Sequence, residues 1–331
     1  MGYIADEVDR LAASGPFSGV VSVSRGATIE FERAYGLADR AHRIPVVPDS
    51  RFGIASATKG LTALTVVSLI ADGALELSTT ARSVLGTDLP LIADNVTVEH
   101  LLAHRSGIGD YLDEDTAPDV GDHVLPVPVH ELATTEQYLP VLGGYPSKFA
   151  AGERFAYCNG GYVVLALIAE RVTRRSFYDL VRERVCVPAG MLDTGFLRSD
   201  ELPGRAALGY LSDGPRTNVL HLPVRGSGDG GAYSTVADIR AFWQALDAGR
   251  IVSSAWVAHM LRPHSDGPAE KMRYGLGFWL DASGPAVSLE GYDAGVSFRS
   301  VHDPDSGRTD TVVSNTSEGA WPIARYLSAT G

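Results

Sequence analysis

The sequence predicts an α+β fold in which an antiparallel sheet, built from both ends of the chain and flanked by helices, lies beside a mainly helical region. Strand-like runs are concentrated near the two ends of the 331-residue chain, whereas its middle carries dense apolar patterns at helical spacing. We therefore assign residues 1–55 and 215–331 to the sheet region and residues 56–214 to the helical region.

The individual elements follow from local patterns. Apolar runs on either side of Arg25-Gly26-Ala27 indicate a β-hairpin near the N-terminus, and the closely spaced apolar residues after Asn159 are typical of a buried helix. The predicted strands cover residues 20–23, 29–35, 275–280, 286–289, 297–301 and 309–314. The predicted helices cover residues 1–15, 56–73, 97–107, 159–173, 177–187, 235–246 and 321–328.

Composition and charge exclude some classes of partner and indicate the cellular compartment. The net charge is −12 and no basic stripe occurs, which argues against nucleic acid or an anionic membrane as partner. No apolar run approaches the 18 residues that a membrane-spanning helix needs. The N-terminal pattern is acidic and amphipathic, unlike a secretory signal, and the only cysteines are Cys158 and Cys186, which suits a reducing compartment. We expect a cytoplasmic protein.

Residues 51–60, RFGIASATKG, begin the stretch around which the chain is organised. Ser56 and Lys59 are three residues apart at the start of an apolar helix, so their side chains share one face. A serine hydroxyl becomes a good nucleophile when a nearby base takes its proton, and a desolvated lysine can be that base. Ser-x-x-Lys is the acylating signature of penicillin-binding proteins and serine β-lactamases.

Further stretches resemble the class C β-lactamase-like serine hydrolases, in the same order along the chain. Residues 101–108 read LLAHRSGI, residues 155–162 read FAYCNGGY with a Tyr-x-Asn before a helix, residues 230–238 read GGAYSTVAD and residues 274–278 read YGLGF. The resemblance spans roughly residues 19–315. It implies a β-lactamase/transpeptidase-like fold with the active site between the two regions, a small ester or amide as substrate, and no cofactor.

Carried over to this chain, the resemblance gives Ser56 as nucleophile and Lys59 as its activating partner. Tyr157, as phenolate or as a phenol linked to Lys59, passes a proton between Ser56 and the leaving group. Asn159 either donates its amide to the substrate or caps the next helix, and both roles are compatible. The oxyanion hole is expected to combine the N–H of Ser56 with one from the late strand.

The late strand departs from the family pattern. Residues 290–298 read EGYDAGVSF, where the family usually has Lys-Thr-Gly or His-x-Gly. One register puts Tyr292 at the Lys/His position and the other puts Asp293 there, and neither supplies a cation. The second oxyanion donor is expected near Gly295 or Val296. Arg299 is a candidate replacement for the cation, although strand alternation does not fix its direction.

Asp293 therefore has two readings. If it faces the site, it repels a substrate carboxylate and favours neutral or amine-bearing acyl donors over penicillins and free-carboxylate peptides. Alternatively, it points away and accepts hydrogen bonds from backbone N–H groups of a tight turn.

Three other patterns resemble known kinds of binding site. Residues 226–231 match the dinucleotide fingerprint but lack a second βαβ signal. His100 and His104 have a metal-ligand spacing on a predicted helix, without a third ligand. The acidic segment 109–130 lacks calcium-loop spacing and is a candidate lid or pocket wall. We expect no metal and no cofactor.

The leading hypothesis is a serine hydrolase, of esterase or D-aminopeptidase-like amidase type, that forms an acyl-enzyme on Ser56. A second hypothesis is a transacylase that passes the acyl group to an amine, with the loop 109–130 controlling access of water. A third is a binding protein that keeps the fold without turnover. The oligomeric state is left open.

Overall fold

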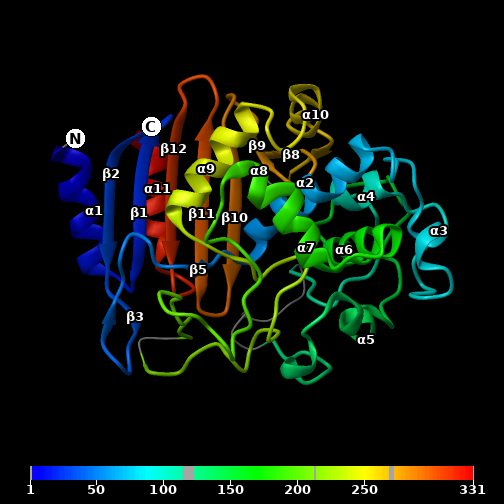
Figure 1. The fold of residues 1–331 in the computed structure, drawn as a ribbon, viewed down its shortest axis with the longest axis horizontal. Helices are drawn as coiled ribbons and strands as arrows, with labels where there is room; N and C mark the ends of the chain where they lie inside the picture. Colours follow the sequence, from blue (N-terminus) through cyan, green and yellow to red (C-terminus); the bar gives the residue numbers. More distant parts are fainter. Residues whose placement is uncertain (1, 115–122, 212–213, 268–271, 331) are drawn as a thin grey trace.

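The computed structural model describes residues 2–114, 123–211, 214–267 and 272–330. Its centre is an eight-stranded sheet with the strand order β2-β1-β12-β11-β10-β9-β8-β7 (Figure 1). These strands are β1 Gly19–Arg25, β2 Thr28–Tyr35, β7 Ser265–Asp266, β8 Met272–Tyr274, β9 Trp279–Asp281, β10 Val287–Asp293, β11 Val296–Asp303 and β12 Arg308–Ser314. The short strands β3 Leu37–Asp39, β4 Ile44–Pro45, β5 Phe52–Gly53 and β6 Tyr233–Ser234 form two separate pairs.

The sheet is assembled from both ends of the chain, as the sequence predicted. β1 pairs antiparallel with β12, with Gly19 opposite Ser314, and with β2 on its other edge. β10, β11 and β12 follow as a meander. The predicted α+β, β-lactamase-like fold class is confirmed, whereas the exact division of the chain at residues 55 and 215 stays a prediction.

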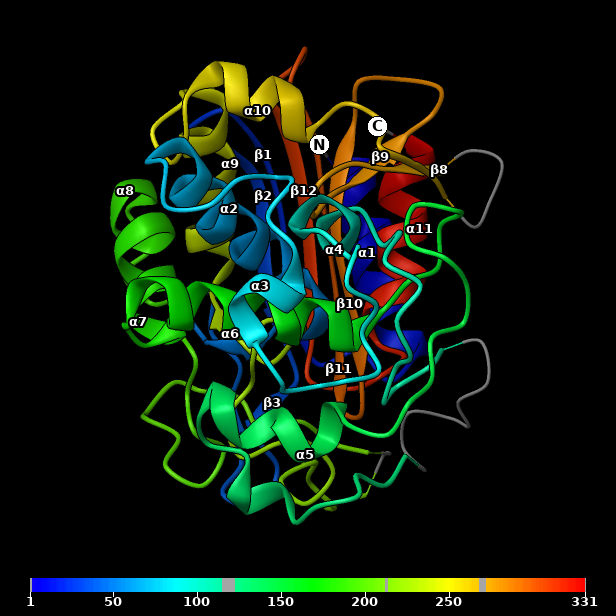
Figure 2. The ribbon, with the colours of Figure 1, turned by 90° about the vertical axis from the view of Figure 1, so that its right-hand side faces the viewer.

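Helices cover both faces of the sheet, and the remaining helices form a region beside it (Figure 2). They are α1 Gly2–Ser14, α2 Thr58–Ala71, α3 Ala81–Leu85, α4 Val98–Leu102, α5 Leu139–Leu142, α6 Asn159–Thr173, α7 Phe177–Val181, α8 Val187–Ala189, α9 Val236–Asp247, α10 Ser254–Met260 and α11 Ala320–Thr330. The 3-10 helices are η1 Ala55–Ala57, η2 Val129–Glu131 and η3 Thr135–Tyr138, and η4 Arg182–Cys186 is a π-helix between α7 and α8. No described helix has the length and apolar character to cross a bilayer.

Two apolar cores correspond to the two faces of the sheet. The amphipathic helices α1 and α11 pack on one face, where their apolar side chains meet those of β1 and β12. The larger core lies on the other face and includes α2 and α6. Both helices are buried along nearly their whole length, because their sequences are apolar on all sides. They therefore hold the residues at their N-termini in fixed positions.

Two predicted elements are corrected by the structure. The helix predicted for 97–107 ends at Leu102, because His104 and Gly107 both have left-handed backbones, with φ of +53° and +66°. Of the strand predicted for 275–280, residues 275–278 form a turn between β8 and β9 instead, and only the last two residues belong to β9. Gly277 there has φ +89°, and a Cβ atom at this position would lie 2.3 Å from the Cβ of Ala63 in α2. Close approach to α2 thus requires glycine.

Candidate active site

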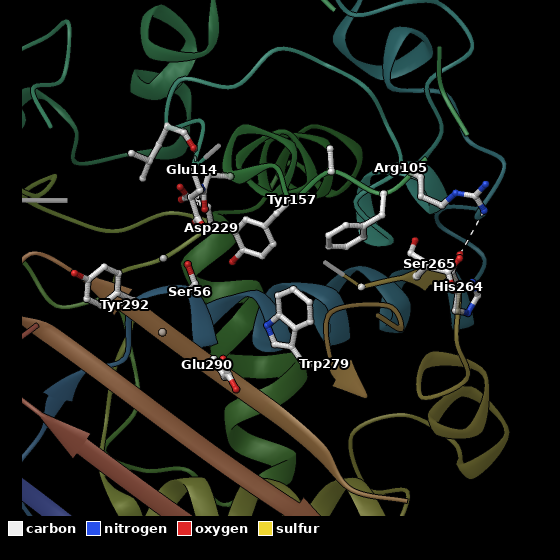
Figure 3. Close-up of a pocket in the computed structure, with 18 of the residues that line it drawn as sticks. Ser56, Arg105, Glu114, Tyr157, Asp229, His264, Ser265, Trp279, Glu290 and Tyr292 are labelled. Atoms are coloured by element: carbon white, nitrogen blue, oxygen red, sulfur yellow. Dashed lines mark hydrogen bonds between the residues drawn. The ribbon is translucent and has the colours of Figure 1, made fainter. Parts of the chain in front are cut away.

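Ser56 lies in a tight turn between strand β5 and helix α2. The preceding residue, Ala55, has φ +44°, a left-handed conformation that non-glycine residues rarely adopt. The one-turn helix η1 then leads directly into α2, so the side chains of Ser56 and Lys59 lie on the same side, as the spacing predicted. Lys59 Nζ is 3.0 Å from Ser56 Oγ. The strained turn presents the Ser56 hydroxyl to the cavity (Figure 3).

The amine of Lys59 is buried and has three oxygen partners. Besides Ser56 Oγ, Nζ donates to Oδ1 of Asn159 at 2.8 Å and to the carbonyl of Asp229 at 2.7 Å. The latter two oxygens only accept, so they take two N–H groups of Lys59 in either protonation state. When the amine is neutral, its lone pair is consequently directed at Ser56. This arrangement can remove the proton from the serine hydroxyl.

The orientation of the Asn159 amide is set by its other contacts. Its Nδ2 donates to the carbonyl of Leu112 at 3.0 Å and to Oε1 of Glu114 at 3.3 Å. Both are acceptors, which places the amide oxygen toward Lys59. Asn159 therefore orients Lys59 as well as lining the cavity.

Asn159 is not the cap of helix α6, contrary to the alternative considered from the sequence. The carboxylate of Asp110 caps the helix, because it accepts from the N–H of Asn159 at 2.6 Å and from that of Gly160 at 2.8 Å. Asn159 is the first helical residue, and its side chain is left to contact Lys59. Burial raises the pKa of Asp110 to about 6, against the lowering effect of these N–H groups.

The Tyr157 hydroxyl points toward Ser56 (Figure 3). Lys59 Nζ lies 4.8 Å from the Tyr157 ring centroid. Burial raises the pKa of Tyr157 well above 10, the nearby carboxylate of Glu114 adds to this, and the hydrogen bond with Ser56 acts in the opposite direction. Of the two states predicted for Tyr157, the neutral phenol is therefore favoured in the resting site.

His104 packs against Tyr157 and contacts the backbone on both sides of it. Its carbonyl accepts from the N–H of Ala156 at 2.9 Å and its Nδ1 accepts from the N–H of Cys158 at 3.0 Å. Its ring lies against the Tyr157 ring, with centroids 4.3 Å apart. Burial, together with the charge of Lys59, lowers the pKa of His104 well below its usual value. His104 is thus a neutral imidazole that fixes the backbone on both sides of Tyr157.

The late strand reaches the Ser56 turn through a different glycine from the one expected. A Cβ atom at Gly291 would lie 2.1 Å from the carbonyl oxygen of Ile54, so β10 and η1 are in direct contact there. If Gly291 is taken as the last residue of Lys-Thr-Gly, the cation position falls on Leu289, which is buried. No cation is present in this register either.

Gly295 and Val296 do not supply the second oxyanion donor that the sequence suggested. The N–H of Gly295 donates to Ser317 Oγ at 2.8 Å, and Val296 pairs with Asp293 across the hairpin. Because N–H groups alternate between the two edges of a strand, those of Gly291 and Asp293 point to β11. The N–H of Tyr292 points to the opposite edge, where η1 packs against β10.

The side chains of Tyr292, Asp293 and Arg299 go in three directions. The Tyr292 hydroxyl donates to Glu318 Oε1 at 2.9 Å at the rim of the cavity. Asp293 lines the cavity and also accepts from the N–H of Ala294 at 2.8 Å. It therefore does not point away from the site although it makes the turn contact, and its effect on charge selectivity stays a prediction. Arg299 lies 2.9 Å from Glu290 and donates to Ser328 of α11, and so is directed away from Ser56.

Carboxylates gather on one side of Ser56. Asp229 and Asp293 line the cavity with Glu114, and Figure 3 shows Glu114 and Asp229 on the same side of Tyr157 as Tyr292. The pKa of Asp293 is raised to about 7, mainly by burial and in addition by the charges of Asp229 and Glu114, against the lowering effects of the Ala294 N–H and of Lys59. The pKa of Asp229 is raised by its burial as well. Tyr111 donates its hydroxyl to Asp229.

The cavity has a volume of about 1200 Å³. The loop 109–130 contributes Tyr111, Leu112 and Glu114 to its wall, in agreement with the predicted pocket wall. Residues 115–122 lie outside the described residues, so the predicted lid and the acidic residues in that span stay predictions.

The remaining sequence patterns have structural explanations. His100 Nδ1 accepts from the N–H of Thr97 in a capping box, and His104 lies beyond the end of that helix. No group of three potential metal-ligating side chains occurs within the described ranges. In the segment 226–231, a Cβ at Gly228 would lie 2.1 Å from the carbonyl of Tyr162. Its glycines therefore permit close packing, and Asp229 between them presents its carbonyl to Lys59.

Comparisons with known proteins identify the family. A sequence profile described as Beta-lactamase matches residues 4–328. The chain belongs to the beta-lactamase family. By family it is a serine hydrolase. The crystal structure of a penicillin binding protein from Bacillus halodurans is similar, with 35% identity and a TM-score of 0.91 over 98% of this chain and 100% of that one.

Two curated relatives have names that state an activity. Esterase EstB of Burkholderia gladioli is 35% identical over 58% of this chain, and a D-aminopeptidase of Brucella ovis is 27% identical over 82% of it. The chain spans about half the length of each of these relatives, 49% and 50% respectively.

Sequence reasoning missed Asp110, Tyr111 and Asp229. Asp110 and Tyr111 stand directly after the Leu-Leu-x-His-x-Ser-Gly stretch, and Asp229 stands inside the glycine cluster. Their closeness to recognised motifs was the available signal. Their roles depend on contacts with residues about 50 to 170 positions away, which no local pattern reveals.

Proposed function

We propose that the protein hydrolyses small esters or amides through an acyl-enzyme on Ser56, with Lys59 and Tyr157 as proton-transfer groups. The hydrogen bonds of Lys59 are the main support for this proposal. Asn159 Oδ1 and the Asp229 carbonyl can only accept, so the remaining hydrogen-bonding position of the Lys59 amine faces Ser56 Oγ. The similarity to an esterase and a D-aminopeptidase supports the same reaction class.

The steps follow from the geometry. Lys59 takes the Ser56 proton as Oγ attacks the substrate carbonyl carbon. The resulting oxyanion accepts hydrogen bonds from the N–H of Ser56 and from the N–H of Tyr292 on the open edge of β10. Tyr157 passes a proton to the leaving group as the bond to it breaks, which leaves the acyl group on Ser56. Water then attacks the acyl-enzyme with the same groups acting in reverse.

We propose that the acyl half of the substrate is neutral or carries an amine. Asp229, Asp293 and Glu114 surround the space where that half lies, and no lysine or arginine among the described residues replaces the family's cation beside Ser56. A carboxylate there meets like charge, whereas an ammonium group meets opposite charge. D-Amino acid amides or esters are therefore preferred over penicillins and peptides with a free carboxylate.

The nucleophile is tested by covalent labelling. Intact-mass analysis after treatment with a fluorophosphonate or an activated ester is expected to show one adduct on the wild type and none on Ser56→Ala. Equal labelling rates of the two proteins would overturn the assignment. Turnover of an ester that is lost in Ser56→Ala would also exclude a binding protein without turnover.

Transfer of the acyl group to an amine is a second candidate. The cavity extends well beyond Ser56 on the side of Trp279, which leaves room for an acceptor after the first leaving group departs. Product analysis with an ester donor and increasing amine concentration separates the two reactions. Free acid as the sole product at every amine concentration would exclude transacylation.

A further inference from the structure

Beyond Tyr157, the wall of the cavity is aromatic. Tyr157, Trp279 and Phe155 line it together, and all three are partly exposed. The Tyr157 and Trp279 rings are nearly parallel, at 9° with centroids 5.9 Å apart, and the Phe155 centroid lies 6.0 Å from that of Trp279. We call these three residues the aromatic wall. Figure 3 shows Trp279 on the opposite side of Ser56 from Tyr292.

The aromatic wall is rigid. Trp279 belongs to β9 of the main sheet, and the ring of Tyr274 on β8 packs edge-on against it at 4.8 Å. Tyr157 is held by His104. A flat surface with fixed rings can take a flat partner without first losing conformational freedom.

The position of Tyr157 determines which half of the substrate meets this wall. Tyr157 delivers the proton to the leaving atom, so that atom lies within hydrogen-bonding reach of the Tyr157 hydroxyl. Glu114 and Asp229 lie on the side of Tyr157 away from Trp279 (Figure 3). The leaving group must therefore extend along Trp279 and Phe155.

We propose that the aromatic wall is the subsite for the alcohol or amine half of the substrate, and that it selects a flat aromatic or apolar group. This inference rests on the proposed function, because the role of Tyr157 sets the direction of the leaving group. The same subsite would receive an amine acceptor in acyl transfer.

Charge does not compete with this selection. The rim beyond the aromatic wall carries Arg105 and Arg154 but also Glu153 and Asp266. Arg105 donates to the carbonyls of Gly152 and His264. Glu290, which also lines the cavity, is paired with Arg299 at 2.9 Å. Charges of both signs are thus present at this end.

The first test uses two esters of the same acid whose leaving groups are equally acidic, one aromatic and one aliphatic. In the wild type, the aromatic ester is expected to have the larger kcat/KM. Trp279→Leu is expected to reduce the ratio of the two kcat/KM values by about three- to tenfold, the scale of one aromatic contact. Trp321→Leu alters a cavity-lining tryptophan whose ring lies 6.1 Å from that of Tyr292, on the other side of Ser56 (Figure 3), and is expected to leave the ratio unchanged.

An equal loss for both esters in Trp279→Leu would overturn the proposal, because Trp279 would then act only by supporting Tyr157. Phe155→Leu gives a second measurement of the same ratio, with a smaller reduction expected. A ratio that falls equally in Trp321→Leu would also contradict the assignment.

The second test does not require turnover. Binding of phenol to Ser56→Ala is measured by saturation-transfer NMR, and again after adding Trp279→Leu or Trp321→Leu. Weakening by at least about threefold with Trp279→Leu alone supports the subsite, even if labelling shows another nucleophile. Equal binding to all three proteins, or loss only with Trp321→Leu, would overturn it.

Discussion

Gly291 of strand β10 lies directly against Ile54, whose carbonyl oxygen would be 2.1 Å from any Cβ atom at position 291. This contact sets the distance between the open edge of β10 and the turn that carries Ser56. An added methyl group must push the two backbones apart, because neither is a flexible side chain.

Gly291→Ala is therefore expected to displace the Tyr292 N–H from the oxyanion position. The expected loss is about 10²- to 10³-fold in kcat, as for removal of one oxyanion donor. Gly284→Ala is the matched control, since nothing lies within 4 Å of a Cβ there. Steady-state kinetics of both variants on one ester checks this. Full activity of Gly291→Ala would exclude the proposed donor.

Asp293 is expected to make charge selectivity depend on pH. Burial raises the pKa of its carboxyl to about 7, so the group is neutral below that pH and charged above it. The ratio of kcat/KM for cationic over anionic esters should rise as pH increases through 7. Asp293→Asn should give a smaller rise, with a matched neutral ester as reference and Asp94→Asn, which changes an exposed carboxylate outside the cavity lining, as control. A native preference for anionic donors would overturn the prediction.

The same raised pKa has a consequence for stability. The folded protein binds the Asp293 proton more tightly than the unfolded chain does, whose carboxyl titrates near 3.8. The contribution of this group to stability is therefore greatest at low pH and decreases as pH rises from about 4 to about 7. Denaturant unfolding at pH 5 and pH 8 should show a larger decrease in the wild type than in Asp293→Asn. Identical decreases would indicate an ordinary pKa.

Asp110→Ala is expected to destabilise helix α6 and to lower activity. It removes the acceptor for the N–H groups of Asn159 and Gly160, and loss of a helix cap typically costs about 0.5–2 kcal/mol. Asp110→Asn keeps one acceptor oxygen and should be intermediate. Thermal unfolding measures the effect, with Asp94→Ala, a 91% exposed carboxylate, as control. A Tm equal to that of the control would refute the cap.

His104 variants separate its two contacts with the Tyr157 segment. His104→Asn keeps an acceptor near the Nδ1 position and tolerates the positive φ, whereas His104→Phe keeps an aromatic ring but leaves the Cys158 N–H without its acceptor. We expect a loss of about tenfold in kcat for His104→Phe and a smaller loss for His104→Asn. The reverse order would show that the ring contact is the more important one. Circular dichroism confirms that each variant is folded.

The sequence was sufficient for those parts of the site that are local. Ser56 and Lys59 share one helical turn, so their contact follows from spacing alone, and Tyr157 stands in a recognisable motif. Alternation along the late strand did not reveal which N–H groups face Ser56, because that depends on the hairpin register between Asp293 and Val296. The sequence therefore predicted the donor near Gly295 or Val296, whereas Gly291 is the glycine that contacts the Ser56 turn.

Contacts between distant segments were also beyond the sequence. Asp110 caps a helix that begins 49 residues later, and His104 supports a segment more than 50 residues away. His104 was expected on a helix, whereas its left-handed backbone ends that helix. These long-range contacts form only when the chain packs, so they cannot be predicted from composition or periodicity.

The pairing of Gly19 with Ser314 has a consequence for biosynthesis. At about 5–20 residues per second, the ribosome needs about 15–60 s to extend the chain from the first of these positions to the second. Ser56 and Lys59 leave the ribosome early, but β10 joins the N-terminal strands only through β11 and β12. The nascent chain therefore carries its nucleophile without an oxyanion hole until β10, β11 and β12 have left the ribosome and joined the N-terminal strands.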